Sequence, residues 1–188
     1  MNPLHAQLKS ATATLHDKTE KALFVEAIVS HQLSREQLTT ILLAQYQFNW
    51  ALEQAVQSIE VLRQEYQAHH RYKTDLLRAD LAELGTPLPD EAPAWDIFSE
   101  AELFGACYVA EGSTLGGKII RKHLTQSAQL NGLSFHYYSV YGTDVGPQWK
   151  LFLTFLDYHS QRLLPAEVVL GAQKSFHFLL QAVQEVRV

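Results

Sequence analysis

Residues 108–124 read YVAEGSTLGGKIIRKHL and belong to the most unusual of the predicted helices. Its apolar residues recur at helical spacing, yet Gly112, Gly116 and Gly117 interrupt it. Each glycine lowers helix stability by about 1 kcal/mol relative to alanine, so the three together lower it by roughly 2–3 kcal/mol. Gly112 and Gly116 are four residues apart and share a face, which leaves the backbone bare and the helix free to bend. Either a flat ligand or a second helix can lie against such a face, and the spacing does not choose between them.

Helical periodicity continues in both directions from this stretch, and strand-like alternation is scarce. Capping boxes open two of the predicted helices, with Ser34 followed by Gln37 and Ser99 followed by Glu102. Helices are predicted over about 3–24, 34–59, 71–84, 99–130, 148–163 and 165–185, with a proline-rich connection over 86–98. The sequence therefore predicts an all-α, single-domain bundle of roughly six to eight helices over residues 1–188.

Composition narrows the class of protein. With 188 residues, 47% hydrophobic and 19% charged, the chain suits one globular domain with a real core. A net charge of -5 without a Lys/Arg run argues against nucleic acid as a partner. The single cysteine, Cys107, excludes an internal disulfide and suits a reducing cytoplasm, where we expect a buried, inert thiol. The polar N-terminus and the lack of a long apolar run predict neither a signal peptide nor a membrane span.

The first predicted helix carries a candidate ligand set. Lys9 and His16 are seven residues apart and point the same way, with Glu20 one turn further on. His16 borders the apolar stripe of Leu8 and Leu15, so its ring can reach the interior and ligate a metal or heme iron. Lys9 could pair with a carboxylate of the same ligand, and Glu20 could orient the imidazole. A histidine at the border of an apolar face is more often simply exposed or hydrogen-bonded, so this set is weak alone.

Both segments together resemble the heme oxygenase family, especially its bacterial, biliverdin-producing members. YVAEGSTLGG (108–117) resembles the distal helix, and LKSATATLHDKTE (8–20) resembles the proximal helix. QYQFNWALE (45–53), YGTDVGPQWKLFLTFLD (141–157) and KSFHFLLQAV (174–183) are similar to further helices of the family. The resemblance extends over roughly residues 4–185, and it rests on the Lys9/His16 spacing combined with EGSxLGG.

The resemblance implies a role for each matching position. His16 takes the place of the iron ligand, and the implied catalytic set is His16, Gly112, Ser113 and Gly116. The implied heme-binding set is Lys9, His16, Glu20, Tyr108, Gly112, Gly116, Gly117, Lys150 and Phe178. Two positions depart from the animal enzymes: Ser113 stands where they carry an aspartate that orders distal water, and Thr154 stands where they carry a propionate-binding arginine. These departures leave open the seating of heme and the meso carbon that is attacked.

The activity implied by the resemblance is oxidative cleavage of heme, as both cofactor and substrate, to biliverdin, carbon monoxide and iron. Dioxygen is the co-substrate, and electrons come from an external ferredoxin or flavin reductase, because the chain shows no flavin or iron–sulfur motif. The basic cluster Lys118, Arg121 and Lys122 could dock an acidic donor, although such clusters are more often solvated faces. The resemblance also allows a bilin-accepting photoreceptor as a partner, and iron acquisition as the alternative purpose.

Other readings stay open at the level of sequence. A non-catalytic heme carrier of the same fold is the main alternative, since Ser113 is not an acid and Thr154 is not a basic anchor. A third possibility is the same bundle used for another small molecule, as in thiamin-degrading relatives. Glu65 and His69 miss the Glu-x-x-His spacing of a di-iron bundle, so we expect them to face solvent. The remaining histidines, such as His123 and His159, show no ligand spacing.

Overall fold

The computed structural model describes residues 3–66, 68–91, 93–97 and 99–186, and within these ranges it contains helices and no strand. The α-helices are α1 (Pro3–Ala22), α2 (Val25–Val29), α3 (Arg35–Gln57), α4 (Glu60–Gln64), α5 (Ala68–Arg71), α6 (Thr74–Glu83), α7 (Glu100–Ser113), α8 (Gly117–Thr125), α9 (Val145–Ser160) and α10 (Pro165–Val186). Three 3-10 turns accompany them, η1 (Thr114–Gly116), η2 (Ala128–Leu130) and η3 (Tyr137–Ser139). The predicted all-helical class is confirmed.

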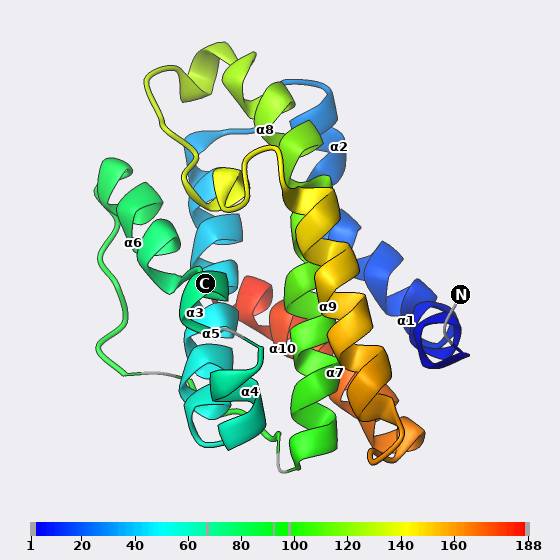
Figure 1. The fold of residues 1–188 in the computed structure, drawn as a ribbon. Coiled ribbons are helices and arrows are strands. Elements are labelled where there is room, and N and C mark those ends of the chain that lie inside the picture. The colour runs from blue at the N-terminus through cyan, green and yellow to red at the C-terminus, as the bar shows by residue number, and fades with distance from the viewer. Residues whose placement is uncertain (1–2, 67, 92, 98, 187–188) are drawn as a thin grey trace.

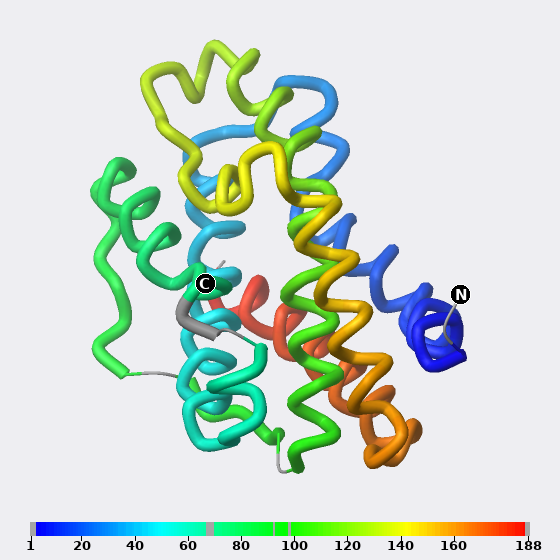
Figure 2. The backbone as a smooth tube through the Cα atoms, viewed as in Figure 1, coloured from blue at the N-terminus to red at the C-terminus, as the bar shows by residue number. Residues whose placement is uncertain are grey.

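The bundle is built around α7 and α10. Figure 1 shows α7 and α9 running side by side, with α10 crossing behind them and α2 and α8 together at one end. The tube in Figure 2 shows the same arrangement and the long connection over 126–144 that wraps the α8 end. Helix α1 packs on α10, and α3 packs on α6, α7 and α10. Both capping boxes are present as predicted, at Ser34 before α3 and at Ser99 before α7.

Two glycines allow the central helices to touch backbone to backbone. A Cβ at Gly105 of α7 would lie 2.0 Å from the carbonyl oxygen of Val168, and one at Gly171 of α10 would lie 1.9 Å from the carbonyl oxygen of Glu102. No side chain fits at either distance. Close packing through small residues therefore occurs in this protein, at Gly105 and Gly171.

The predicted helix over 99–130 is wrong in its continuity. The α-helical ladder stops at Ser113, tightens into η1 and resumes as α8 from Gly117 to Thr125. The hydroxyls of Ser113 and Thr114 bond back to the carbonyls of Ala110 (2.8 Å) and Glu111 (2.7 Å), so side chains compete with the ladder where glycine already weakens it. The distal segment is thus a helix broken at its glycines.

Other predicted boundaries also move. The helix placed over 71–84 begins at Thr74, because the carboxylate of Glu53 on α3 accepts the backbone N–H groups of Lys73 (2.6 Å) and Thr74 (3.0 Å) and caps α6 from a distant element. The first helix ends at Ala22, since Phe24 adopts a left-handed φ of 55°. Helix α9 begins at Val145, three residues before its predicted start.

None of the helices in the described ranges combines the length and apolar character needed to span a bilayer.

Candidate active site

A cavity of about 650 Å³ lies between α1 and the α7–η1 break, and this volume is typical of small-ligand sites. Its α1 wall includes Lys9, His16 and Glu20. The opposite wall includes Gly112 and Gly116, joined by the exposed apolar side chain of Leu115. The structure therefore places the two segments singled out in the sequence on the same cavity, 96 residues apart along the chain between His16 and Gly112.

Nothing within the protein requires glycine at positions 112 and 116. A Cβ at Gly112 would meet the Trp149 ring at 3.8 Å, and one at Gly116 would meet Ile120 at 3.6 Å, both ordinary van der Waals contacts. Neither glycine has a positive φ. Helix packing therefore requires glycine at Gly105 and Gly171 but not at Gly112 and Gly116, which leave bare backbone on the cavity wall. A ligand in the cavity could lie close to this wall.

The imidazole of His16 is accessible from the cavity. Its side chain is 56% exposed, and its ring meets the edge of the Phe176 ring at a centroid distance of 6.1 Å. Nδ1 of His16 lies 3.8 Å from a Glu20 carboxylate oxygen and 4.0 Å from one of Asp17. Both carboxylates thus flank Nδ1, which leaves Nε2 as the nitrogen for a metal ion.

The end of the cavity beyond Lys9 is aromatic. The rings of His5, Tyr108 and Trp149 lie at mutual centroid distances of 5.6–5.9 Å. Burial, helped by the nearby Lys9 ammonium, lowers the pKa of His5, so this ring is neutral at pH 7. Lys9 carries a positive charge on the α1 wall of the cavity, beside this aromatic group.

Polar groups gather beside the glycine wall, which is the part of the cavity lining formed by Gly112 and Gly116. The hydroxyl of Tyr137 on η3 donates to Oε1 of Gln45 on α3 (3.0 Å) and lies 3.4 Å from the Ser113 hydroxyl. Burial raises the pKa of Tyr137, so its proton stays on the oxygen. Ser113, Tyr137 and Gln45 all line the cavity. Ser113 is not an acid, but its neighbours supply hydrogen-bonding groups that the sequence motif did not indicate.

Three residues of the implied heme-binding set do not line this cavity. Gly117 packs against the Tyr138 backbone, which a Cβ would meet at 3.4 Å. Lys150 is exposed on α9, and its carbonyl accepts a bond from Thr154. Phe178 packs between Phe48 and Trp95 in the core. The resemblance assigned these positions by sequence alone, and the tertiary packing places none of the three on the cavity lining.

Sequence reasoning missed a buried charge cluster next to the glycine wall. The carboxylate of Glu111, 1% exposed, accepts bonds from Arg71 (2.5 Å), Lys73 (2.8 Å), the Tyr66 hydroxyl (2.9 Å) and the Tyr141 hydroxyl (3.0 Å). These partners come from the segment before α6 and the segment before α9. The cluster therefore joins both segments to Glu111, which directly precedes Gly112. One sequence feature pointed to this cluster, because Glu111 is the only charged residue between Glu102 and Lys118.

Electrostatics hold this cluster in its charged form. Burial alone would raise the pKa of Glu111, but the adjacent Lys73 and Arg71 lower it overall. Burial likewise opposes the charge on Lys73, and Glu111 reverses this and raises its pKa. In the same region burial, with the Glu111 charge, raises the pKa of Cys107 to about 12, and the thiol is buried as expected.

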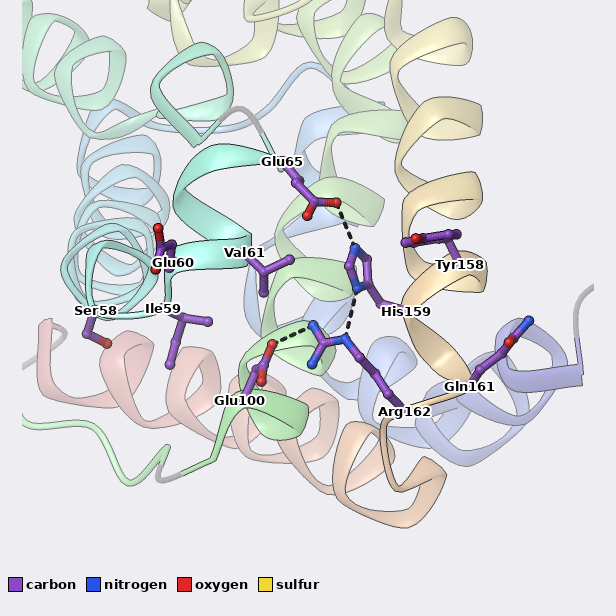
Figure 3. A pocket seen from close by; sticks show the side chains of 10 residues that line it. All are labelled: Ser58, Ile59, Glu60, Val61, Glu65, Glu100, Tyr158, His159, Gln161 and Arg162. Carbon is purple, nitrogen blue, oxygen red and sulfur yellow. Dashed lines mark hydrogen bonds and ion pairs between the residues drawn. The ribbon is translucent and has the colours of Figure 1, made fainter.

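A second pocket lies at the opposite end of the bundle (Figure 3), between α4, α7 and α9. A chain of side chains crosses it: Glu65 accepts from Nε2 of His159 (3.1 Å), Nε of Arg162 donates to Nδ1 of His159 (3.0 Å), and Arg162 bonds Glu100 (2.6 Å). Both ring nitrogens of His159 are therefore occupied, and the chain links three helices. Glu65, expected to face solvent, is 56% exposed but engaged in this link. The side chain of His69 lies outside the described residues.

Fold and cavity together define a class: an all-helical protein whose cavity is lined on one side by an imidazole of the first helix and on the other by bare backbone of a broken distal helix. The family model described as "Heme oxygenase" matches residues 2–185. The chain therefore belongs to the heme oxygenase family.

Individual relatives agree with this assignment. The chain is 33% identical over 111 residues to a heme oxygenase of Xanthomonas campestris pv. campestris, a match that covers 58% of this chain and 66% of that relative, just under two thirds of its length. The fold is similar to that of a heme oxygenase from Neisseria meningitidis (TM-score 0.77, 21% identity, 97% of this chain and 91% of that chain). It is also similar to heme oxygenase-1 from the cyanobacterium Synechocystis sp. PCC6803, solved in complex with heme (TM-score 0.71, 17% identity, 98% and 92%).

Proposed function

We propose that this protein is a heme oxygenase, which cleaves heme oxidatively to biliverdin, carbon monoxide and iron with dioxygen and external electrons. One observation carries the proposal: His16 and the side-chain-free backbone of Gly112 and Gly116 line one cavity, and no protein group accounts for the two glycines. Heme, when bound, supplies the iron that activates dioxygen and the ring that is cleaved.

In this proposal His16 would hold the heme iron through Nε2. The carboxylates of Glu20 and Asp17 near Nδ1 favour a proton on that nitrogen, which would leave the lone pair on Nε2. As a neutral ligand, this imidazole would put less electron density on the iron than a thiolate would. Lys9, two turns earlier, pairs with a propionate of the ligand.

The glycine wall acts on the opposite face. Backbone without side chains at Gly112 and Gly116 lets the ring lie close and leaves little room for unrelated solvent. Ser113 and Tyr137 are the hydroxyl groups beside this wall, and Gln45 orients the Tyr137 hydroxyl. We propose that these groups hold the water that delivers protons, a task that an aspartate performs in the animal members.

Electrons come from an external ferredoxin or flavin reductase. The basic side chains of Lys118, Arg121 and Lys122 lie exposed on α8, beside the α7–η1 break, and supply a surface complementary to an acidic donor. A cytoplasmic location and a bilin-accepting photoreceptor stay predictions.

Hemin titration followed by reduction tests the proposal. We expect a Soret band on adding hemin to the purified protein, and then loss of that band with appearance of biliverdin when a ferredoxin system and dioxygen are supplied. His16→Ala should abolish turnover, whereas His177→Ala, at an exposed position of α10, should retain it. A stable Soret band under reducing turnover conditions would instead identify a heme carrier, and the absence of any band would identify a site for another small molecule.

A further inference from the structure

Two histidines far apart in the sequence meet at the seam between α2 and α8. His31 follows α2, and His123 lies in the last turn of α8. Nε2 of His31 lies 2.9 Å from Nδ1 of His123, with ring centroids 5.1 Å apart and ring planes tilted by 40°. Because 92 residues separate them, no spacing rule could have paired them.

We propose that His31 and His123 form a two-histidine site for a divalent transition-metal ion of the Cu²⁺ or Ni²⁺ kind. Metal–imidazole bonds are about 2.0–2.1 Å long, so two nitrogens 2.9 Å apart subtend an angle of about 90° at a shared ion. A tetrahedral angle would need a separation of about 3.3–3.4 Å with the same bond lengths. The observed spacing therefore matches square-planar or octahedral coordination, which Cu²⁺ and Ni²⁺ adopt with nitrogen ligands.

The pair can release both ligand nitrogens at little cost. One hydrogen lies between the two rings, and a tautomer change moves it to the far nitrogen of its own ring. Both facing nitrogens then carry lone pairs, which a rotation of the exposed rings turns toward a shared ion. The pair is solvent-exposed, and water can complete the coordination shell. The hydrogen bond that is given up contributes little net stability at an exposed position, and metal coordination replaces it.

The other histidine clusters do not offer this. His159 has both nitrogens committed, to Glu65 and to Arg162. His16, grouped with Asp17 and Glu20, belongs to the cavity already described. His31 and His123 line neither pocket.

An ion at this seam would join two elements that wall the cavity. Val25 and Ile28 of α2 and Ile120 of α8 line the cavity, so an ion bridging the ends of the two helices restrains that wall. Since any coupling of this kind is reciprocal, metal should tighten hemin binding and hemin should tighten metal binding by the same factor.

Titration with Cu²⁺ and Ni²⁺ tests the site. In hemin-loaded protein, where His16 is occupied, we expect one ion per chain by calorimetry, two nitrogen ligands in the Cu²⁺ electron paramagnetic resonance spectrum, and a higher Tm with metal. His31→Gln and His123→Gln should each remove this binding, and the double variant should lose no more than either one. His136→Gln, which changes another exposed histidine, paired with Glu83, should leave it intact.

Two results would overturn the proposed site at His31 and His123. One-to-one binding that persists in His31→Gln, or a spectrum with a single nitrogen ligand, would show that the ion binds elsewhere. Both substitutions lie on the surface, and melting without metal checks that each variant folds. If the protein fails to bind hemin, the same titration on apo-protein carrying His16→Ala still decides the metal site, so the two proposals fail separately.

Discussion

Alanine at Gly112 should stabilise the protein and weaken hemin binding at the same time. The added Cβ would sit 3.8 Å from the Trp149 ring, so no clash opposes it within the protein. Removing a glycine from α7 is therefore expected to add about 0.5–1 kcal/mol to the free energy of unfolding of the apo-protein. The methyl group occupies space at the cavity wall, where overpacking costs about 1–3 kcal/mol. This corresponds to a Kd for hemin that rises by roughly fivefold to more than a hundredfold.

The predicted gain in apo-protein stability and the predicted loss of hemin affinity are measured separately, so the two can be told apart. Urea unfolding of the apo-protein gives the stability change, and Soret titration gives the affinity. Gly105→Ala is the matched control on the same helix: its Cβ would lie 2.0 Å from the Val168 carbonyl oxygen, so it should destabilise the apo-protein. A Gly112→Ala protein that is destabilised yet binds hemin as tightly as the parent would refute the reasoning, because glycine would then serve packing.

The buried charge cluster and the buried thiol yield three further predictions. Glu111→Gln leaves the Arg71 and Lys73 charges buried without their anion and should cost about 3–5 kcal/mol in urea unfolding, whereas Glu60→Gln at an exposed position should stay within about 0.5 kcal/mol. Because the folded-state pKa of Glu111 lies below its unfolded value of about 4.3, its contribution is complete above that pH and is lost as pH falls through the folded pKa. The gap between parent and Glu111→Gln should therefore narrow in acid, and a gap independent of pH would contradict the assignment. The pKa of about 12 for Cys107 predicts that a thiol reagent reacts only after unfolding, and rapid labelling of native protein would show otherwise.

Local physics explains what could be predicted from sequence. The capping boxes at Ser34 and Ser99 and the helical periodicity depend on residues within one or two turns, so they fixed the class and most helix starts. The resemblance brought His16 and the EGSTLGG segment to one site, and both line the same cavity. The predicted start of α6 was wrong because it depends on a residue far away in the sequence: Glu53 on α3 caps this helix.

Spacing along the backbone was enough to predict an all-helical chain with a histidine on its first helix and glycines that weaken a later helix, because these features depend on residues within a few turns. The break of that later helix at η1 was not predicted. Which glycines serve helix packing depends on the tertiary structure, since a Cβ at Gly105 would clash with the Val168 carbonyl oxygen whereas one at Gly112 would make only ordinary contact with the Trp149 ring. Packing likewise assembled the Glu111 cluster, in which Glu111 meets partners 30 to 45 residues away, and the His31–His123 pair, whose members lie 92 residues apart. Contacts at such separations depend on how helices cross, and no local pattern encodes that.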